Sequence, residues 1–177
     1  MVDQGTIIDV FSLLGIPGLT EAWAKFIAEG AIVCLEDQGH RNITGMLIVG
    51  DCNENCSLSW RTAPDIEDSW QDKEQATEFG AYGIAILIVV KLMGFERVQR
   101  SYKGTGFDFW VGNNAHGFLF QNKTKLEVSG ILKGASSDIS SREKKKVDQV
   151  RRFETNRSPA IIIIVEFGAP QARVKKL

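Results

Sequence analysis

The chain has 177 residues, of which 44% are hydrophobic and 24% are charged, and this composition is ordinary for a globular protein with a full core. Its formal net charge of −1 excludes a strong overall field that would recruit nucleic acid or a membrane, so such a partner has to be met by a local patch. The three cysteines are an odd number without the spacing of a disulfide framework, which favours a reducing compartment over secretion.

The sequence predicts neither a signal peptide nor a membrane-spanning helix. Its N-terminus carries acids and no basic region, and its longest apolar run, residues 80–90, is too short to cross a bilayer. We therefore expect a cytoplasmic protein without a membrane partner. Residues 1–177 are expected to form a single domain, in which residues 1–68 precede a main unit at 69–177.

Two helices and a β-hairpin are expected in the first 68 residues. Thr20 has a side chain that N-cap positions favour, and apolar residues follow it at helical spacing, although Gly30 lowers the helix propensity. The turn-forming sequence GDCNENCS separates two strand-like runs. The predicted elements are helices at 6–14 and 21–36 and strands at 44–49 and 58–61.

A zinc site is one interpretation of the cysteines and a nearby histidine in this region. The relevant residues are Cys34, His40, Cys52 and Cys56, and the Cys-x-x-x-Cys spacing of the last two occurs in zinc sites. Cys34, however, lies on an apolar helix face, where a thiol usually packs as a small hydrophobe. Ordinary packing is therefore the favoured interpretation for these cysteines.

A long helix is expected to begin near Ser69 and Asp72, which resemble a capping box, and to end at Gly94. Residues 84–90 are apolar on all sides, which predicts burial on most sides. Glu78 falls in line with this buried stripe by helical spacing. The alternative is that Glu78 is a partly exposed glutamate favoured by the helix dipole.

Strand-like segments follow the long helix at 95–101, around Asp108, at 117–121 and at 125–132. Gly104 and Gly106 permit a turn or a close backbone approach just before Asp108. We expect a turn at Asn122, between the last two segments. His116 is alone in a polar turn and is expected at the surface rather than in a catalytic site.

Two carboxylates, Asp108 and Glu127, stand in strand segments where both neighbours are apolar. A carboxylate at the inward edge of a sheet is costly unless something compensates for its charge. A divalent cation shared by the two acids is the functional compensation. The alternative is a structural carboxylate held by hydrogen bonds.

A second helix is expected at 139–153, with N-cap candidates at 136–138. Its apolar stripe contains Lys146, which lies between Phe153 and Ile139 on a helical wheel. This lysine either extends to solvent along its own stem or reaches a buried anionic site. The adjoining face carries Arg142, Lys145, Gln149 and Arg152.

The C-terminal segment contains the continuous β-branched run AIIIIVEF at 160–167. Such a run is typical of a strand that is buried on both faces. The last residues, among them Arg173, Lys175 and Lys176, are expected to form a basic tail.

From about residue 72 the predicted elements are a helix, three strands, a helix and a strand. Glu78 lies on the first helix, Asp108 at the start of a strand, and Glu127-x-Ser129 on the next core strand. This order and these residues together resemble the PD-(D/E)xK nuclease superfamily. The resemblance covers roughly the last two-thirds of the chain. It implies an α/β fold with a restriction-endonuclease-like αβββαβ core, in which helices flank a mixed central sheet. The N-terminal helices and hairpin would precede this core.

The resemblance also implies roles for individual residues. Glu78 matches the helix acid of the family, Asp108 the central aspartate and Glu127 the glutamate of Glu-x-Lys. Gln149 with Phe153 resembles the Gln-x-x-x-Tyr element of the exonuclease-type branch, with Phe in place of Tyr. The implied cofactor is Mg²⁺ or Mn²⁺, and the implied metal ligands are Asp108, Glu127 and the backbone at Val128.

The main departure from the family pattern is Ser129, which stands where the family has its lysine. Some members supply that lysine from the second helix instead, and Lys146 is well placed for this role. Lys145 is the second choice, and Lys103 and Lys133 are weaker candidates.

The resulting expectation is a magnesium-dependent nuclease that hydrolyses phosphodiester bonds of nucleic acid, with DNA favoured over RNA, in bacterial defence or DNA processing. Basic residues would contact the nucleic-acid backbone, and Tyr102 and Trp110 would stack on bases. These basic residues are Arg97, Arg100, Lys103, Arg142 and Arg152.

Two other functions stay open. Ser129 and the near-neutral net charge favour a non-catalytic subunit or scaffold of the same fold that binds a partner protein. An unrelated α/β interaction module with structural acids is the third. Residues 1–68 would form a homodimer surface or complete the sheet.

Overall fold

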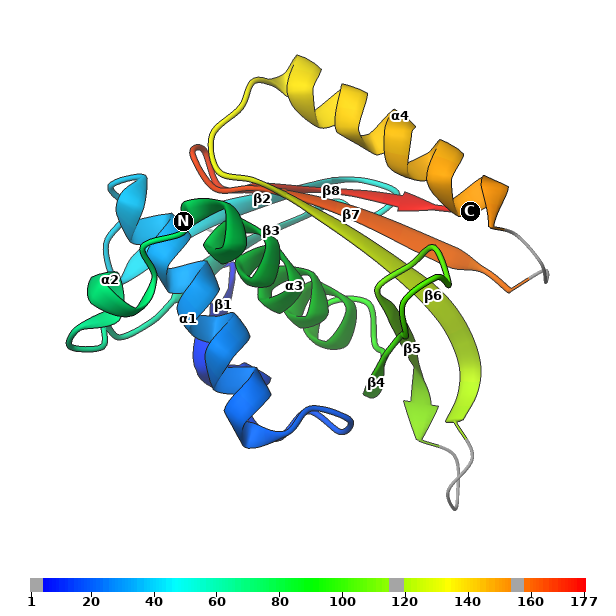
Figure 1. The fold of residues 1–177 in the computed structure, drawn as a ribbon, viewed down its shortest axis with the longest axis horizontal. Coiled ribbons are helices and arrows are strands. Elements are labelled where there is room, and N and C mark those ends of the chain that lie inside the picture. The colour runs from blue at the N-terminus through cyan, green and yellow to red at the C-terminus, as the bar shows by residue number, and fades with distance from the viewer. Residues whose placement is uncertain (1–4, 115–119, 154–157) are drawn as a thin grey trace.

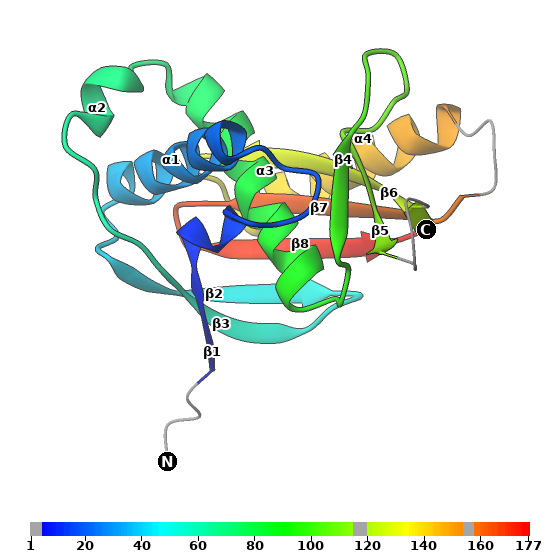
Figure 2. The ribbon, with the colours of Figure 1, turned by 90° about the horizontal axis from the view of Figure 1, so that it is seen from below.

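The computed structural model describes residues 5–114, 120–153 and 158–177. In this part of the chain, eight strands form one mixed sheet in the order β1-β3-β2-β8-β7-β6-β5-β4, which confirms the predicted α/β class. Helices α1 and α3 lie against one face of the sheet, and α4 lies across the other (Figure 1). The view in Figure 2 shows α1 and α3 crossing in front of the strands.

The elements follow one another along the chain as β1 (Thr6–Asp9), the 3-10 helix η1 (Val10–Leu13), α1 (Glu21–Asp37), β2 (Ile43–Gly50), β3 (Glu54–Ser59), α2 (Ile66–Ser69), α3 (Lys73–Lys91), β4 (Arg97–Arg100), β5 (Phe109–Asn114), β6 (Phe120–Ile131), α4 (Ser136–Arg152), β7 (Ala160–Glu166) and β8 (Gln171–Lys176). None of the helices in the described ranges is both long and apolar enough to cross a membrane.

The predicted helix at 6–14 is wrong in its first half. Thr6–Asp9 form strand β1, which pairs in parallel with β3, and only Val10–Leu13 turn into a short 3-10 helix. The Asp9 carboxylate accepts a hydrogen bond from the Phe11 N–H at 2.9 Å, so it ends the strand and caps the helical turn.

The hairpin of β2 and β3 is confirmed, but β3 begins earlier than predicted. Residues 54–57 were expected in the turn because of their polar composition, yet they pair with β2. The partner strand supplies backbone hydrogen bonds that outweigh the local turn preference. The hairpin joins the rest of the sheet through β2 and β8, so the described part of the N-terminal segment extends the sheet, as one of the two hypotheses held.

Helices α1 and α3 cross at two glycines. A Cβ atom on Gly80 would lie 2.7 Å from the Ala31 nitrogen, and one on Gly30 would lie 2.9 Å from the Gly80 nitrogen. Gly30, which lowers the propensity of α1, is thus required for the close approach of the two helices. Thr20 caps α1 as predicted, because its hydroxyl accepts the Trp23 N–H.

The start of α3 differs slightly from the prediction. Asp72 is the N-cap, and its carboxylate accepts the N–H groups of Glu74 and Gln75 at 3.0 and 3.1 Å. Ser69 instead ends the short helix α2, which the sequence analysis missed. Residues 84–89 of α3 are buried, as their apolar composition predicts.

The predicted turn at Asn122 is wrong, because β6 runs without a break from Phe120 to Ile131. Its first half pairs with β5 in antiparallel orientation, and Lys125–Ile131 pair with β7 in parallel orientation, so one long strand joins the two parts of the sheet. His116 and residues 117–119 lie outside the described residues.

Strand β7 is buried on both faces, as its sequence predicts. Ile161, Ile163 and Val165 pack into the core under α1 and α3, whereas Ile162 and Ile164 pack beneath α4. The side chains of β7 thus alternate between two apolar layers, and their burial on both faces stabilises the centre of the sheet.

The predicted basic tail is wrong, because Gln171–Lys176 form β8 between β7 and β2. Ala172 and Val174 are buried, while Arg173 and Lys175 point to the other face. This alternation is the side-chain period of a strand, but the basic residues near the end of the sequence suggested a tail instead.

The predicted N-caps of α4 are also wrong. The helix begins at Ser136, and the Asp138 carboxylate accepts the Ala135 N–H at 2.7 Å.

Replacing Gly80 with alanine should lower the free energy of unfolding by about 1–3 kcal/mol, because the new methyl group would push the two helix backbones apart. Urea unfolding followed by circular dichroism measures this difference. Gly45→Ala is the matched control, since a Cβ atom there has no neighbour within 4 Å. Equal stability of the two variants would contradict the glycine-mediated crossing.

Candidate active site

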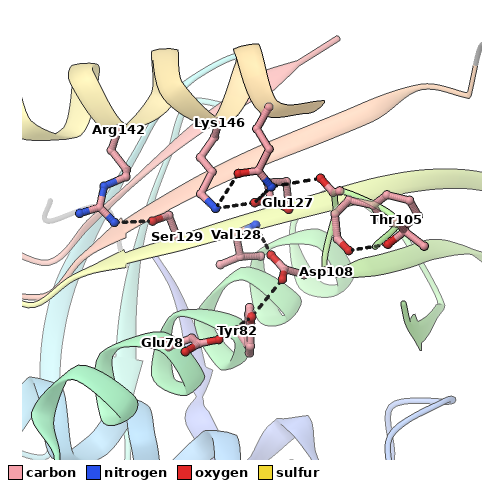
Figure 3. A network of polar contacts seen from close by, with 12 residues as sticks. Glu78, Tyr82, Thr105, Asp108, Glu127, Val128, Ser129, Arg142 and Lys146 are labelled. Carbon is pink, nitrogen blue, oxygen red and sulfur yellow. Dashed lines mark hydrogen bonds and ion pairs between the residues drawn. The ribbon is translucent and has the colours of Figure 1, made fainter. Parts of the chain in front are cut away.

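A cleft of about 930 Å³ opens where β5 begins, between α3 on one side and α4 on the other. Its lining includes the six residues to which the resemblance assigns catalytic or metal-binding roles: Glu78, Asp108, Glu127, Val128, Lys146 and Gln149. Figure 3 shows Glu78 on α3, Glu127 and Val128 on β6 and Lys146 on α4, with Asp108 between α3 and β6.

The position of Asp108 follows from the end of a strand. Its backbone N–H donates to the Leu126 carbonyl at 3.0 Å, and β5 starts at the next residue. On the other side of Asp108, the chain leaves the sheet through a loop that contains Gly104 and Gly106, both with positive φ. The carboxylate therefore lies at the open end of β5, beside β6.

Two hydrogen bonds fix the Asp108 carboxylate. Its Oδ1 accepts from the Tyr82 hydroxyl at 3.0 Å, and its Oδ2 accepts from the Val128 N–H at 2.9 Å. The N–H and C=O of one strand residue point to the same side, so the Val128 carbonyl faces the side of Asp108 as well.

Glu127 lies almost entirely out of solvent, with 2% of its side chain exposed. Its Oε1 accepts from the Lys146 Nζ at 2.6 Å and from the Gln149 Nε2 at 3.1 Å. Burial and then the nearby Asp108 carboxylate raise the pKa of Glu127 to about 7, while Lys146 acts in the opposite direction. The two acids are therefore close enough to compete for a proton or to share a cation.

Glu78 is exposed on the wall of the cleft, which agrees with the alternative of a solvent-accessible glutamate. It is nevertheless linked to the acid pair, because the Tyr82 hydroxyl lies 3.0 Å from both Glu78 Oε1 and Asp108 Oδ1. A phenol has one proton and donates to one carboxylate at a time. Burial and the carboxylates of Asp108 and Glu78 raise the pKa of Tyr82, so it stays a donor at neutral pH.

Lys146 is the candidate lysine that the structure brings to the acid pair. Lys103 also lines the cleft, whereas Lys145 and Lys133 are exposed and are not among the described lining residues. Ser129, which stands in the family's lysine position, accepts a hydrogen bond from the Arg142 Nη1 at 2.9 Å. Sequence analysis missed this contact.

Gln149 and Phe153 join α4 to the loop before Asp108. The Gln149 Nε2 donates to the Gly106 carbonyl at 3.2 Å. A Cβ atom on Gly106 would lie 2.5 Å from the Phe153 ring, so the glycine makes room for the aromatic side chain. Phe153 is 49% exposed and does not belong to the buried stripe in which the helical wheel placed it.

Sequence analysis also missed the setting of Arg100. Its guanidinium carbon lies 4.7 Å from the Tyr82 ring centre, 5.0 Å from that of Phe109 and 5.4 Å from that of Trp23. The cleft carries cations and acids together, and these are Lys73, Arg100, Lys103, Arg142 and Lys146 with Glu74, Glu78, Asp108 and Glu127. Arg97 and Arg152 are not among the described lining residues.

The oxygen atoms of the acid pair fit a magnesium or manganese ion. Asp108, Glu127 and the Val128 carbonyl supply oxygen ligands from adjacent segments, and Mg²⁺ in enzymes commonly binds one or two carboxylates and completes its shell with water and phosphate. Among the described residues there is no group of three or more His, Cys, Asp or Glu side chains that could hold a metal ion. A metal here would therefore depend on solvent or substrate for its other ligands.

The described residues do not support the zinc hypothesis. Cys34 is buried in α1, where its Sγ hydrogen-bonds to the Thr77 hydroxyl at 3.7 Å. Burial raises the pKa of Cys34 to about 12 and that of Cys56 to about 11, which disfavours the thiolate form that binds zinc. His40 contacts the carbonyls of Phe167 and Gly168 through Nε2.

Three comparisons, with protein-family models, with curated proteins and with solved structures, found no match for this chain. Function therefore has to be inferred from the cleft itself.

Replacing Glu127 with glutamine should change how stability depends on pH. The carboxyl pKa is about 7 in the folded protein and near 4.5 in the unfolded chain, so protonated Glu127 stabilises the fold below pH 4.5 and this contribution is lost as the pH rises through 7. The Glu127→Gln variant lacks this loss and should gain up to about 3 kcal/mol relative to the wild type between about pH 5 and about pH 8. Urea unfolding of both proteins measures the difference.

Glu74→Gln is the control, because it removes an exposed carboxylate from the first turn of α3. If Glu74→Gln shows the same pH-dependent gain in stability as Glu127→Gln, the gain does not arise from the burial of Glu127. If Glu127→Gln instead loses stability relative to the wild type as the pH rises, the Lys146 ion pair outweighs the cost of burial.

Proposed function

We propose that the protein is a magnesium- or manganese-dependent nuclease of the PD-(D/E)xK type that hydrolyses phosphodiester bonds of nucleic acid. The observation that carries the proposal is the pairing of Asp108 with Glu127 on adjacent segments at the open end of β5, with Lys146 2.6 Å from Glu127. Two carboxylates and one cation are the groups that this chemistry needs at one place.

The topology of the C-terminal two-thirds supports the proposal. The elements α3, β4, β5, β6, α4 and β7 follow one another in the αβββαβ order that a restriction-endonuclease-like core would have. Within it, β4, β5 and β6 are antiparallel neighbours and β7 joins β6 in parallel, while α3 and α4 cover opposite faces of the sheet. Asp108 precedes the second of these strands and Glu127 lies in the third, and this arrangement supports the metal-binding roles proposed for them.

The residues around the acid pair have distinct roles in this proposal. Asp108, Glu127 and the Val128 carbonyl would hold the metal ion, and Tyr82 orients the Asp108 carboxylate through its hydrogen bond. The bound metal would lower the pKa of a water molecule and stabilise the charge that develops on the phosphate. Lys146 keeps a positive charge beside the acid pair and would bind the scissile phosphate.

Gln149 holds this arrangement together, because it donates to both Glu127 and the Gly106 carbonyl. The cations on the walls of the cleft, Lys73, Arg100, Lys103 and Arg142, would bind phosphates of the substrate on either side of the acid pair. DNA is the favoured substrate, and bacterial defence or DNA processing is the proposed setting.

A non-catalytic scaffold of the same fold is the second candidate. The observation that favours it is that Glu127 already has two partners in this structure, the Lys146 ammonium and the Gln149 amide. A carboxylate that is neutralised by its own chain needs no metal. Metal binding therefore separates the two candidates.

Titration calorimetry with Mg²⁺ and Mn²⁺ on the wild type and on the double variant Asp108→Ala, Glu127→Ala is the first test. The proposal predicts binding by the wild type and none by the double variant. The absence of binding to the intact protein at millimolar concentrations of both metals, with and without a non-cleavable oligonucleotide, would favour the scaffold.

A cleavage assay on single- and double-stranded DNA and RNA tests the activity. Asp108→Asn should lower the metal-dependent rate by at least about 100-fold, and Lys146→Met should lower it by about 100- to 1,000-fold. Lys144→Met is the matched control for Lys146, since Lys144 is exposed on α4 and is not among the described lining residues. Cleavage by the wild type in the presence of a metal chelator, or undiminished cleavage by the Asp108→Asn variant, would contradict the proposed function.

A further inference from the structure

We propose that the substrate of this cleft is a single-stranded nucleic acid, with Tyr102 stacking on an unpaired base and with Arg100 and Arg142 binding phosphates on opposite sides of the acid pair. This inference rests on the proposed nuclease function and specifies the substrate of the same site. It starts from the exposed ring of Tyr102 and from the guanidinium groups of Arg100 and Arg142, which have no acid partner among the described ion pairs.

Tyr102 is the most exposed large hydrophobic side chain among the described residues, at 81%, and it lines the cleft. Its ring takes part in none of the aromatic or cation–π contacts recorded for the described part of the chain. An aromatic ring that packs against nothing in the protein is free to stack on a planar group of a ligand.

The backbone that carries Tyr102 is held in place. The Tyr102 carbonyl accepts from the Thr105 hydroxyl at 3.0 Å, and the Thr105 and Ser101 hydroxyls contact each other. One end of the loop is fixed by the Ser101 N–H, which donates to the Asp108 carbonyl at 2.9 Å. The other end is fixed by the Gln149 amide, which donates to the Gly106 carbonyl at 3.2 Å. The exposed ring is thus presented from an anchored loop, at the rim of the site that contains Asp108.

Arg100 is a cation with no acid partner among the described ion pairs. Three aromatic rings surround its guanidinium carbon at 4.7 to 5.4 Å. The rings hold the group without using its N–H donors, which a phosphate can then bind. Because one of these rings is Tyr82, whose hydroxyl contacts Asp108, Arg100 lies on the α3 side of the acid pair.

Arg142 lies on the α4 side (Figure 3). Its hydrogen bond at 2.9 Å goes to the neutral hydroxyl of Ser129, two residues along β6 from Glu127 and on the same face of the strand. Arg142 takes part in none of the described ion pairs. Two guanidinium groups without acid partners therefore flank the acid pair, one from each layer of helices.

The stacking residue distinguishes a single strand from a duplex. In a duplex the base faces are covered by their neighbours, and an aromatic side chain beside the reacting phosphate has no base to stack on unless that base is unpaired. A net charge of −1 also gives little general attraction for a duplex, whereas a strand bound by stacking needs fewer phosphate contacts. DNA and RNA single strands share this chemistry.

The test is fluorescence anisotropy on the full chain, with Ca²⁺ in place of Mg²⁺ and with three labelled probes: a 12-nucleotide DNA strand, the RNA of the same sequence, and the blunt DNA duplex. The wild type should bind at least one of the single strands about tenfold more tightly than the duplex. Tyr102→Ala should raise the Kd for that single strand by about 10- to 100-fold and leave the duplex Kd unchanged.

Tyr102→Trp is the rescue variant and should bind the single strand as the wild type does. Because Tyr102 is exposed, neither substitution should alter the urea unfolding curve. In a plot of log K against log salt concentration for the single strand, Arg142→Gln should make the negative slope shallower by about 0.7, because one phosphate contact is lost. The matched control is Arg151→Gln, an exposed arginine of the same helix α4 that is not among the described lining residues, and it should leave that slope unchanged.

Duplex binding that equals or exceeds single-strand binding would overturn the inference, and so would an unchanged single-strand Kd in Tyr102→Ala. Either result leaves the nuclease proposal standing if Asp108→Asn abolishes metal-dependent cleavage. The opposite result is that the protein binds a single strand through Tyr102 but does not cleave it with any divalent metal. This result would overturn the nuclease proposal and support the single-strand binding site.

Discussion

The burial of Glu127 is the constraint on which the rest of the cleft depends. A carboxylate in the middle of a sheet, with 2% of its side chain exposed, is tolerated only if cations or hydrogen-bond donors reach it. Both of its donors, Lys146 and Gln149, come from α4. Helix α4 therefore has to cross β6 at this point, and its packing of Val150 against the β7 isoleucines keeps it there.

The two acids are neighbours in the sheet, yet they are held from opposite faces. Asp108 is bound by Tyr82 of α3, and Glu127 by Lys146 of α4. The two faces are joined at the start of β5, because the loop before Asp108 leaves the sheet there and exposes the side of β6. This geometry explains why the cleft contains residues from both helical layers, and it gives a ligand access to both acids at once.

The N-terminal segment contributes to this site as well as to the sheet. Its hairpin extends the sheet beyond β8, while Trp23 of α1 forms one of the three rings around Arg100. The close crossing at Gly30 and Gly80 packs α1 directly against α3, which supplies Glu78 and Tyr82 to the cleft.

Local sequence determined the elements whose pattern is strong: the burial of β7 on both faces, the span of α1 after Thr20, and the apolar length of α3. It also predicted a shared site for Asp108 and Glu127, because carboxylates in apolar segments need compensation, and the family resemblance added Lys146 to that site. Tertiary structure alone decided the strand pairing of residues 54–57 and of β8, since backbone hydrogen bonds from a distant strand outweigh local turn preference and charge. It likewise decided the partners of Ser129, Tyr82 and Arg100, because those contacts join segments far apart in the chain, and their geometry exists only after the layers have packed.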